Sequence, residues 1–303
     1  MTVINMLSLK GREGLAIADE QSSSSIRKYN VTQKLKILPG NIVYGGSGPT
    51  DHLADVYSLA AEKLESKGGY SMRQVHELVN NEVINYNHML IDNYLRARFG
   101  FGRNEFNTGT LGATGGRIDV QILEGASRAV GQLAENTTSS ILLGGVNGDG
   151  FEIYEVSSNG VAGKTARKYG SIGSGADESD KVLSSYVTSL PRDDRDFIGR
   201  EDGLAILVEA TIASSRINNG VGGIPSIIYV SEDGASILEE DKSILTGEII
   251  QGLDADLLDE DHTYELLGDL VFGDSTFEEV ESGMKNQAKD WNKLDRLLRG
   301  YKV

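Results

Sequence analysis

The sequence predicts an α+β protein with four layers, an αββα sandwich in which two stacked antiparallel sheets are each covered by a pair of helices. Two observations support this prediction. Apolar stretches separated by tight turns form hairpins near the start, in the middle and near residue 230. Two pairs of helical segments lie between these hairpins, whereas a parallel sheet needs single helices alternating with single strands. Stacked sheets with a helix pair on each outer face bury the apolar side of every segment.

Four stretches near the start are typical of strands: residues 3–9, 15–18, 34–38 and 41–44. The first two are joined by a short turn, and Pro39-Gly40 predicts a tight turn between the other two. A polar loop is expected over residues 21–30. The first 46 residues are therefore expected to form two hairpins.

Two helices are expected to follow these hairpins. Asp51 is the expected cap of the first, which ends before Gly68-Gly69. Ser71 and Gln74 have the spacing of a capping box, which opens a longer helix that runs to about residue 98. Glycines crowd residues 99–117 without matching a dinucleotide-binding motif, so a Gly-rich insertion at about 99–136 is expected, with a mobile surface loop over 99–117.

The second half repeats the pattern. A strong turn signal at residues 147–150 joins two expected strands, and helices are expected over about 178–190 and 203–217. A last hairpin is expected over 225–238. The chain thus divides into a domain over residues 1–240 and an acidic, helical extension over 241–303, expected to pack on the core or on a neighbouring subunit.

Composition excludes several classes of function. The 303 residues include no cysteine, so disulfides, thiolate metal sites and a cysteine nucleophile are excluded. The net charge of −16 opposes binding to nucleic acid or to anionic lipid. Neither a signal peptide nor an apolar run long enough to span a bilayer is seen. We expect a cytoplasmic protein without a cofactor or a metal, since neither histidine spacing nor the acidic segment after residue 253 forms a ligand set.

Thr2 is the first candidate for chemistry. It follows the initiator methionine, and threonine is small enough for aminopeptidases to remove that methionine. Thr2 would then carry a free α-amine, whose reference pKa is about 7.7–8, beside its own hydroxyl. Such an amine acts as the base that activates the hydroxyl as a nucleophile. The alternative is an ordinary first residue of a strand.

Six short motifs, in order, carry a family resemblance over about residues 2–240. They are Thr2 leading into a strand, the segments 14–21 and 33–37, the turn 47–51, the hairpin 143–154 and the turn 173–175. In this order and with these intervals they resemble the proteasome β-subunits and the bacterial HslV peptidase, which are N-terminal-nucleophile hydrolases. The resemblance implies a threonine-type endopeptidase on the αββα fold, with an extra C-terminal region.

The resemblance also implies a role for each candidate site residue. Thr2 is expected to form an acyl-enzyme, and Lys34 to keep the Thr2 amine unprotonated. Asp19 is expected to orient Lys34 through a charged hydrogen bond. The main-chain N–H of Gly48 is expected to stabilise the oxyanion, and Ser174 to hydrogen-bond the α-amine.

One segment departs from the family. Proteasome subunits carry an Asp and, three residues later, a Ser after the last core helix, where this chain has Ile217 and Gly220. With a frame shift of one residue, Asn218 would supply the polar contact instead. Without that Asp, the amine loses a negative neighbour, so slow, altered or absent activity stays open.

Three functions remain open from the sequence. The first is a threonine peptidase in self-compartmentalised rings of identical subunits that act on polypeptides, with an ATP-dependent unfoldase as a possible partner. The second is another amide acyl-transfer enzyme on the same scaffold, such as an amidase or a peptide ligase. The third is a non-catalytic, proteasome-like ring subunit.

Overall fold

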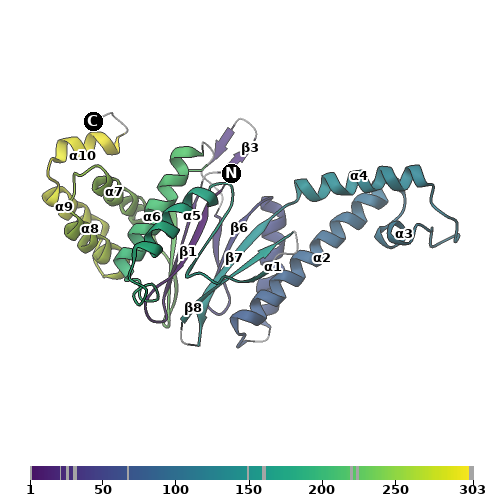
Figure 1. Ribbon diagram of the computed structural model, residues 1–303, viewed down its shortest axis with the longest axis horizontal. Coiled ribbons are helices and arrows are strands. Elements are labelled where there is room, and N and C mark those ends of the chain that lie inside the picture. The colour runs from purple at the N-terminus through teal and green to yellow at the C-terminus, as the bar shows by residue number, and fades with distance from the viewer. Residues whose placement is uncertain are drawn as a thin grey trace.

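The computed structural model describes residues 2–20, 22–24, 27–29, 33–66, 68–148, 150–158, 162–218, 221–222 and 225–299. Within these residues the protein is mixed α/β, and most strands belong to two five-stranded antiparallel sheets. The sheets lie at the centre of the molecule, between the C-terminal helices and a long projecting helix (Figure 1). The prediction of an α+β protein with two antiparallel sheets is confirmed.

The first sheet has the strand order β10-β1-β2-β11-β12. Its strands are β1 (Ile4–Ser8), β2 (Gly14–Asp19), β10 (Tyr169–Ile172), β11 (Pro225–Ser231) and β12 (Gly234–Ile237). Helices α5 (Ala176–Ser189) and α6 (Arg200–Ile217) pack on one face of this sheet. There Leu7 and Ile17 of the sheet join Leu204 and Leu207 of α6 in one buried cluster.

The second sheet has the order β5-β6-β7-β8-β9. Its strands are β5 (Leu35–Leu38), β6 (Ile42–Ser47), β7 (Ser140–Asn147), β8 (Gly150–Ser157) and β9 (Ala162–Lys164). Helices α1 (Thr50–Glu65) and α2 (Met72–Phe99) cover one face of it. Val56 of α1 and Val75 of α2 share a buried cluster with Tyr44 and Leu143 of the sheet.

A third cluster lies between the sheets and explains why β1 is buried along its whole length. Side chains alternate along a strand, so Ile4 and Met6 of β1 contact Val43 and Leu142 of the second sheet. Leu7 faces the opposite way, toward α6. Each of these aliphatic side chains, fully removed from water, contributes about 1.5–3 kcal/mol to folding. A strand that is apolar on both faces requires a layer on each side.

Two predicted loops contain regular structure over part of their length. Residues 22–24 and 27–29, within the expected loop 21–30, form a small hairpin of β3 (Ser22–Ser24) and β4 (Arg27–Tyr29). The Gly-rich insertion holds α3 (Arg103–Thr108) and α4 (Val120–Asn136). Gly100 and Gly109 have φ values of +78° and +66° and end α2 and α3 respectively, so these glycines terminate helices rather than mark a mobile loop.

Of the two predicted helix caps, the one at Ser71 is confirmed and the one at Asp51 is wrong. Ser71 and Gln74 form the predicted capping box, in which the Ser71 hydroxyl accepts from the Gln74 N–H and the Gln74 side chain accepts from the Ser71 N–H. Asp51 does not cap α1. That helix begins at Thr50 after Pro49, and Asp51 lies in the first turn, where a carboxylate is favourable beside the helix N-terminus.

The C-terminal region packs on the core of its own chain. It consists of α7 (Glu240–Asp254), α8 (Glu260–Leu267), the π-helix η1 (Gly268–Phe272), α9 (Phe277–Gln287) and α10 (Trp291–Leu298). Leu245, Leu267, Met284 and Leu294 join the buried cluster over the first sheet and α6. No helix among the described residues is long and apolar enough to cross a membrane.

Candidate active site

The start of β1 is held by the side chain of Asp19. The antiparallel register places Ile4 opposite Ala18, so Asp19, the last residue of β2, lies beside Val3. The Val3 N–H donates to Asp19 Oδ1 at 2.7 Å, and the Asp19 N–H donates to the Val3 carbonyl at 3.3 Å. This pair of hydrogen bonds determines where Thr2 leaves the sheet.

Lys34 reaches Asp19 from the other sheet. Its ammonium Nζ lies 2.8 Å from Asp19 Oδ1, and the two side chains are 5% and 1% exposed. The Gly46 N–H donates to the Lys34 carbonyl at 3.2 Å, which holds Lys34 at the edge of the second sheet, just before β5. The ion pair therefore joins the two sheets at one end of the molecule.

Burial shifts the pKa of both partners. Loss of water raises the pKa of Asp19, and the positive charge and hydrogen bond of Lys34 act against that rise, as do the N–H groups of Val3 and Gly222. Loss of water lowers the pKa of Lys34, and the Asp19 carboxylate opposes that change. A buried charge of either sign is costly alone, so each partner holds the other in its ionised form.

Ser174 contacts Thr2 from the turn before α5. The Thr2 main-chain nitrogen donates to Ser174 Oγ at 3.1 Å, and the Gly175 N–H donates to the Thr2 carbonyl at 3.1 Å. Gly173 has a φ of +99°, and a Cβ there would overlap the Thr2 carbonyl oxygen. The glycine turn before α5 therefore closes around Thr2 because it carries no side chain at Gly173.

Gly48 lies near the same end of the molecule. Its φ is +138°, and a Cβ would lie 2.8 Å from the Thr138 carbonyl oxygen. The neighbouring Ser47 Oγ lies 3.2 Å from the Cβ position of Gly173, which also meets Thr2. The turn after β6 and the turn before α5 therefore meet beside Thr2. The structure thus brings Thr2, Asp19, Lys34 and Ser174 together and places Gly48 at their edge.

Sequence reasoning missed a buried polar chain beneath this site. Ser214 Oγ donates to the Gly175 carbonyl at 2.7 Å and lies 2.8 Å from Ser179 Oγ. Asn5 Nδ2 donates to Ser179 Oγ at 3.1 Å and to Thr211 Oγ1 at 3.0 Å. These residues connect β1, α5 and α6 to Gly175, whose N–H binds the Thr2 carbonyl. A serine inside an amphipathic helix carries no sequence signal of such a role.

Ser214→Ala is expected to lower the free energy of unfolding by about 1–2 kcal/mol, because the buried Gly175 carbonyl and Ser179 hydroxyl each lose a partner. Urea denaturation measures the loss. Ser215→Ala is the matched control, since the Ser215 hydroxyl donates only within its own helix, to the Ile212 carbonyl. Equal effects of the two substitutions would contradict the assigned role of Ser214.

The segment after α6 supplies main-chain groups to the site. Ile217 is 65% exposed, and Asn218 ends α6, with its carbonyl accepting from the Val221 N–H at 2.9 Å. The Gly222 N–H donates to Asp19 Oδ2 at 3.3 Å. Gly220 lies outside the described residues. The described part of this segment thus gives Asp19 an N–H donor.

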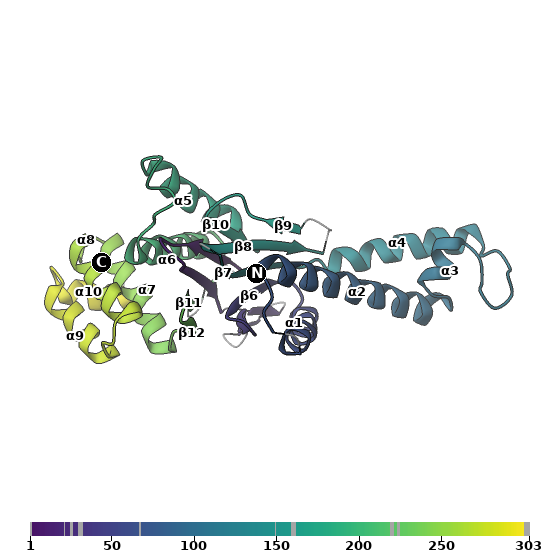
Figure 2. The same cartoon turned by 90° about the horizontal axis from the view of Figure 1, so that it is seen from below.

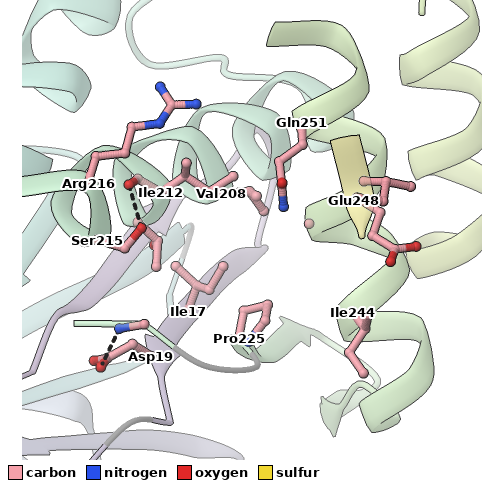
Figure 3. Close-up of a pocket in the computed structure, with 14 residues that line it drawn as sticks. Ile17, Asp19, Val208, Ile212, Ser215, Arg216, Pro225, Ile244, Glu248 and Gln251 are labelled. Atoms are coloured by element: carbon pink, nitrogen blue, oxygen red, sulfur yellow. Dashed lines mark hydrogen bonds between the residues drawn. The ribbon is translucent and has the colours of Figure 1, made fainter. Parts of the chain in front are cut away.

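A cavity of about 500 Å³ lies behind Asp19, between β2, α6 and α7 (Figure 3). Asp19 and Gly222 form one edge, Arg216 lies on the α6 side, and Glu248 and Gln251 line the wall formed by α7. Thr2, Lys34, Gly48 and Ser174 do not line it. The cavity therefore adjoins the ion pair from the helix side and is separate from the surroundings of Thr2.

Among the described residues, no group of three or more His, Asp or Glu side chains is arranged to hold a metal ion. Comparison of the chain with protein-family models and with curated proteins found no match. The geometry around Thr2 is thus the basis for a functional assignment.

Proposed function

We propose that this protein is a threonine-type peptidase that cleaves polypeptides through an acyl-enzyme on Thr2 after removal of Met1. One observation carries the proposal: the buried Asp19 carboxylate binds both the Lys34 ammonium and the N–H of Val3, the residue that follows Thr2. A buried ion pair at the end of two sheets is costly as a structural element alone. The ion pair is explained if the positive charge of Lys34 acts on the α-amine of Thr2.

The chemistry follows from the position of each group. The Thr2 hydroxyl attacks the peptide carbonyl while the α-amine, through a water molecule, takes the hydroxyl proton. The protonated amine then gives this proton to the leaving amine of the substrate. A second water attacks the acyl-enzyme, again with the amine as base, and restores the Thr2 hydroxyl.

The surrounding residues prepare the amine and the oxyanion. The positive charge of Lys34 lowers the proton affinity of the Thr2 amine, so that more of it is unprotonated near neutral pH. Asp19 keeps Lys34 charged and in place. The Ser174 hydroxyl, 3.1 Å from the Thr2 nitrogen, accepts from the amine. The Gly48 N–H is assigned to the oxyanion.

The layer arrangement supports the N-terminal-nucleophile assignment. Apolar clusters lie between α5/α6 and the first sheet, between the two sheets, and between the second sheet and α1/α2. A four-layer αββα sandwich is the arrangement that these contacts favour. The proposal extends to a self-compartmentalised homo-oligomer that shields the site from folded proteins.

The decisive experiment identifies both the N-terminal residue and the residue that a covalent probe labels. Mass spectrometry of the purified protein is expected to show that Met1 is absent, and a β-lactone probe is expected to acylate Thr2. Thr2→Ala is expected to abolish labelling, while Thr2→Ser, which keeps a hydroxyl, retains it. Labelled protein that still carries Met1, or labelling at another residue, would overturn the mechanism.

A further inference from the structure

Residues 84–136 form a helical arm that projects from the sheets (Figure 2). The first part of α2 packs on the second sheet through Val75, Val79 and Val83. Beyond it, in the described part of the chain, a separate apolar cluster around Leu95 and Phe101 contains residues of the arm alone. The 28 residues of α2 span about 42 Å, so about half of that length lies outside the body of the protein.

The arm exposes apolar side chains that its own cluster does not cover. Val120 is 67% exposed, Met89 48% and Ile122 46%. Two of these residues lie in the first turn of α4, at the outer end of the arm. Apolar side chains exposed on a projecting element are available to a protein partner.

The outer end of the arm is also basic, in a chain that is strongly acidic. Residues 96–117 include four arginines and one glutamate, of which Arg96 pairs with Asp92, while the whole arm, residues 84–136, balances five arginines against five carboxylates. Arg98 and Arg117 are exposed, and neither forms an ion pair with the residues that the structure describes. Arg98 instead donates to the Tyr94 hydroxyl at 2.8 Å. These guanidinium groups are available to carboxylates of a partner.

The opposite end of the molecule carries the complementary charge. Residues 239–282 include fifteen acidic side chains and one lysine, which accounts for all but two of the sixteen net negative charges. These residues form α7, α8, η1 and the start of α9. In Figure 1 they lie at the far end of the molecule from the arm.

A groove of about 510 Å³ lies within this acidic face, between the start of α6 and the end of α8. Four carboxylates and two aromatic rings line it: Glu201, Asp202, Glu265, Asp269, Tyr264 and Phe272. No Lys or Arg among the described residues forms an ion pair with these carboxylates. Burial and the neighbouring Glu201 raise the pKa of Asp202. The Arg200 guanidinium already lies 5.7 Å from the Phe272 ring centroid. Carboxylates beside the Tyr264 ring match a further guanidinium, which pairs with the carboxylates and stacks on the ring.

We propose that the arm of one copy docks on the acidic C-terminal face of a second copy, with Arg98 and Arg117 at the groove. The two surfaces lie at opposite ends of the molecule (Figure 1), so the arm of one copy cannot reach its own acidic face, and each copy offers both surfaces of the contact. Such a heterologous contact closes into a ring or continues as a filament. Nucleic acid and anionic membranes would meet the overall charge of −16, which repels them.

This contact between copies is independent of the peptidase chemistry. Its test measures the mass of the assembly and not enzymatic activity. Native mass spectrometry and light scattering at low salt are expected to show multiples of the 32.7 kDa chain. Added salt is expected to dissociate them, because it screens exposed charges. Arg98→Glu/Arg117→Glu and Glu265→Arg/Asp269→Arg are each expected to give monomers.

Mixing the two charge-reversed proteins is the sharpest test. The acidic arm of the first matches the basic groove of the second, so the mixture is expected to reassemble, with both proteins in each particle. Arg73→Glu/Arg192→Glu, on exposed sites of the body, is the control and is expected to assemble like the unmodified chain. Circular dichroism checks that all variants are folded. A monomeric unmodified chain, or assembly that survives either charge reversal, would overturn the proposal.

Discussion

Lys34→Met is expected to destabilise the protein by about 3–5 kcal/mol and to abolish acylation of Thr2. The substitution keeps the length of the side chain but leaves the 1% exposed Asp19 carboxylate without its cation. Asp19→Asn is expected to have a similar effect on stability, because the buried Lys34 ammonium then loses the carboxylate that lies 2.8 Å from it. Urea denaturation measures stability, and β-lactone labelling measures the chemistry.

The double variant Asp19→Asn/Lys34→Met separates structure from function. With both charges removed, no uncompensated ion is buried, so much of the lost stability is expected to return. Labelling of Thr2 is expected to stay abolished, since the positive neighbour of the amine is still missing. A double variant that labels at the rate of the unmodified chain would show that the ion pair serves the fold alone.

Gly173→Ala is expected to slow labelling of Thr2 by about 100-fold, the effect of displacing a reacting group by about 1 Å. A methyl group there overlaps the Thr2 carbonyl oxygen and lies 2.8 Å from the Thr2 carbonyl carbon, and the φ of +99° adds strain. Thr2 must therefore move, and the Gly175 N–H that binds its carbonyl moves with it or loses the hydrogen bond.

Gly163→Ala is the matched control for this substitution. Gly163 lies in β9, its Cβ position has no heavy atom within 4 Å, and its φ is not in the left-handed region. The control is expected to leave the labelling rate unchanged and stability within about 0.5 kcal/mol. Equal labelling by Gly173→Ala and the unmodified chain would contradict the assigned role of the glycine turn in holding Thr2.

Local signals explain which elements the sequence predicts well. The hairpin turn at Pro39-Gly40 and the capping box of Ser71 and Gln74 act within a few residues, so a short window of sequence contains the whole interaction. In the strands around them, apolar residues either alternate with polar ones or run continuously, because a helix layer or the other sheet covers each strand. These features led to two antiparallel sheets with helices between their hairpins.

The sequence predicted α2 but not α3 and α4, the other helices of the arm. In α4, Ala126 and Ala129 are the buried residues, since this helix packs on α2 and α3 rather than on a sheet. Leu123, Ala126 and Val130 of this helix keep helical spacing and belong to the arm's cluster, yet the Gly-rich segment before it favoured a loop. Asp119, which caps α4 by accepting from the Gln121 N–H, was the local signal that could have revealed it.

The sequence by itself determined the strands, most of the helices and, through the ordered motifs, the candidate residues Thr2, Asp19 and Lys34. Only the tertiary structure decided that the Asp19 carboxylate from one sheet meets Lys34 from the other, 2.8 Å apart. It likewise decided that Ser214 binds the Gly175 carbonyl, 39 residues away. Contacts of this kind depend on how the layers stack, and stacking is set by the summed packing of many apolar side chains. A short window of sequence therefore does not predict these contacts.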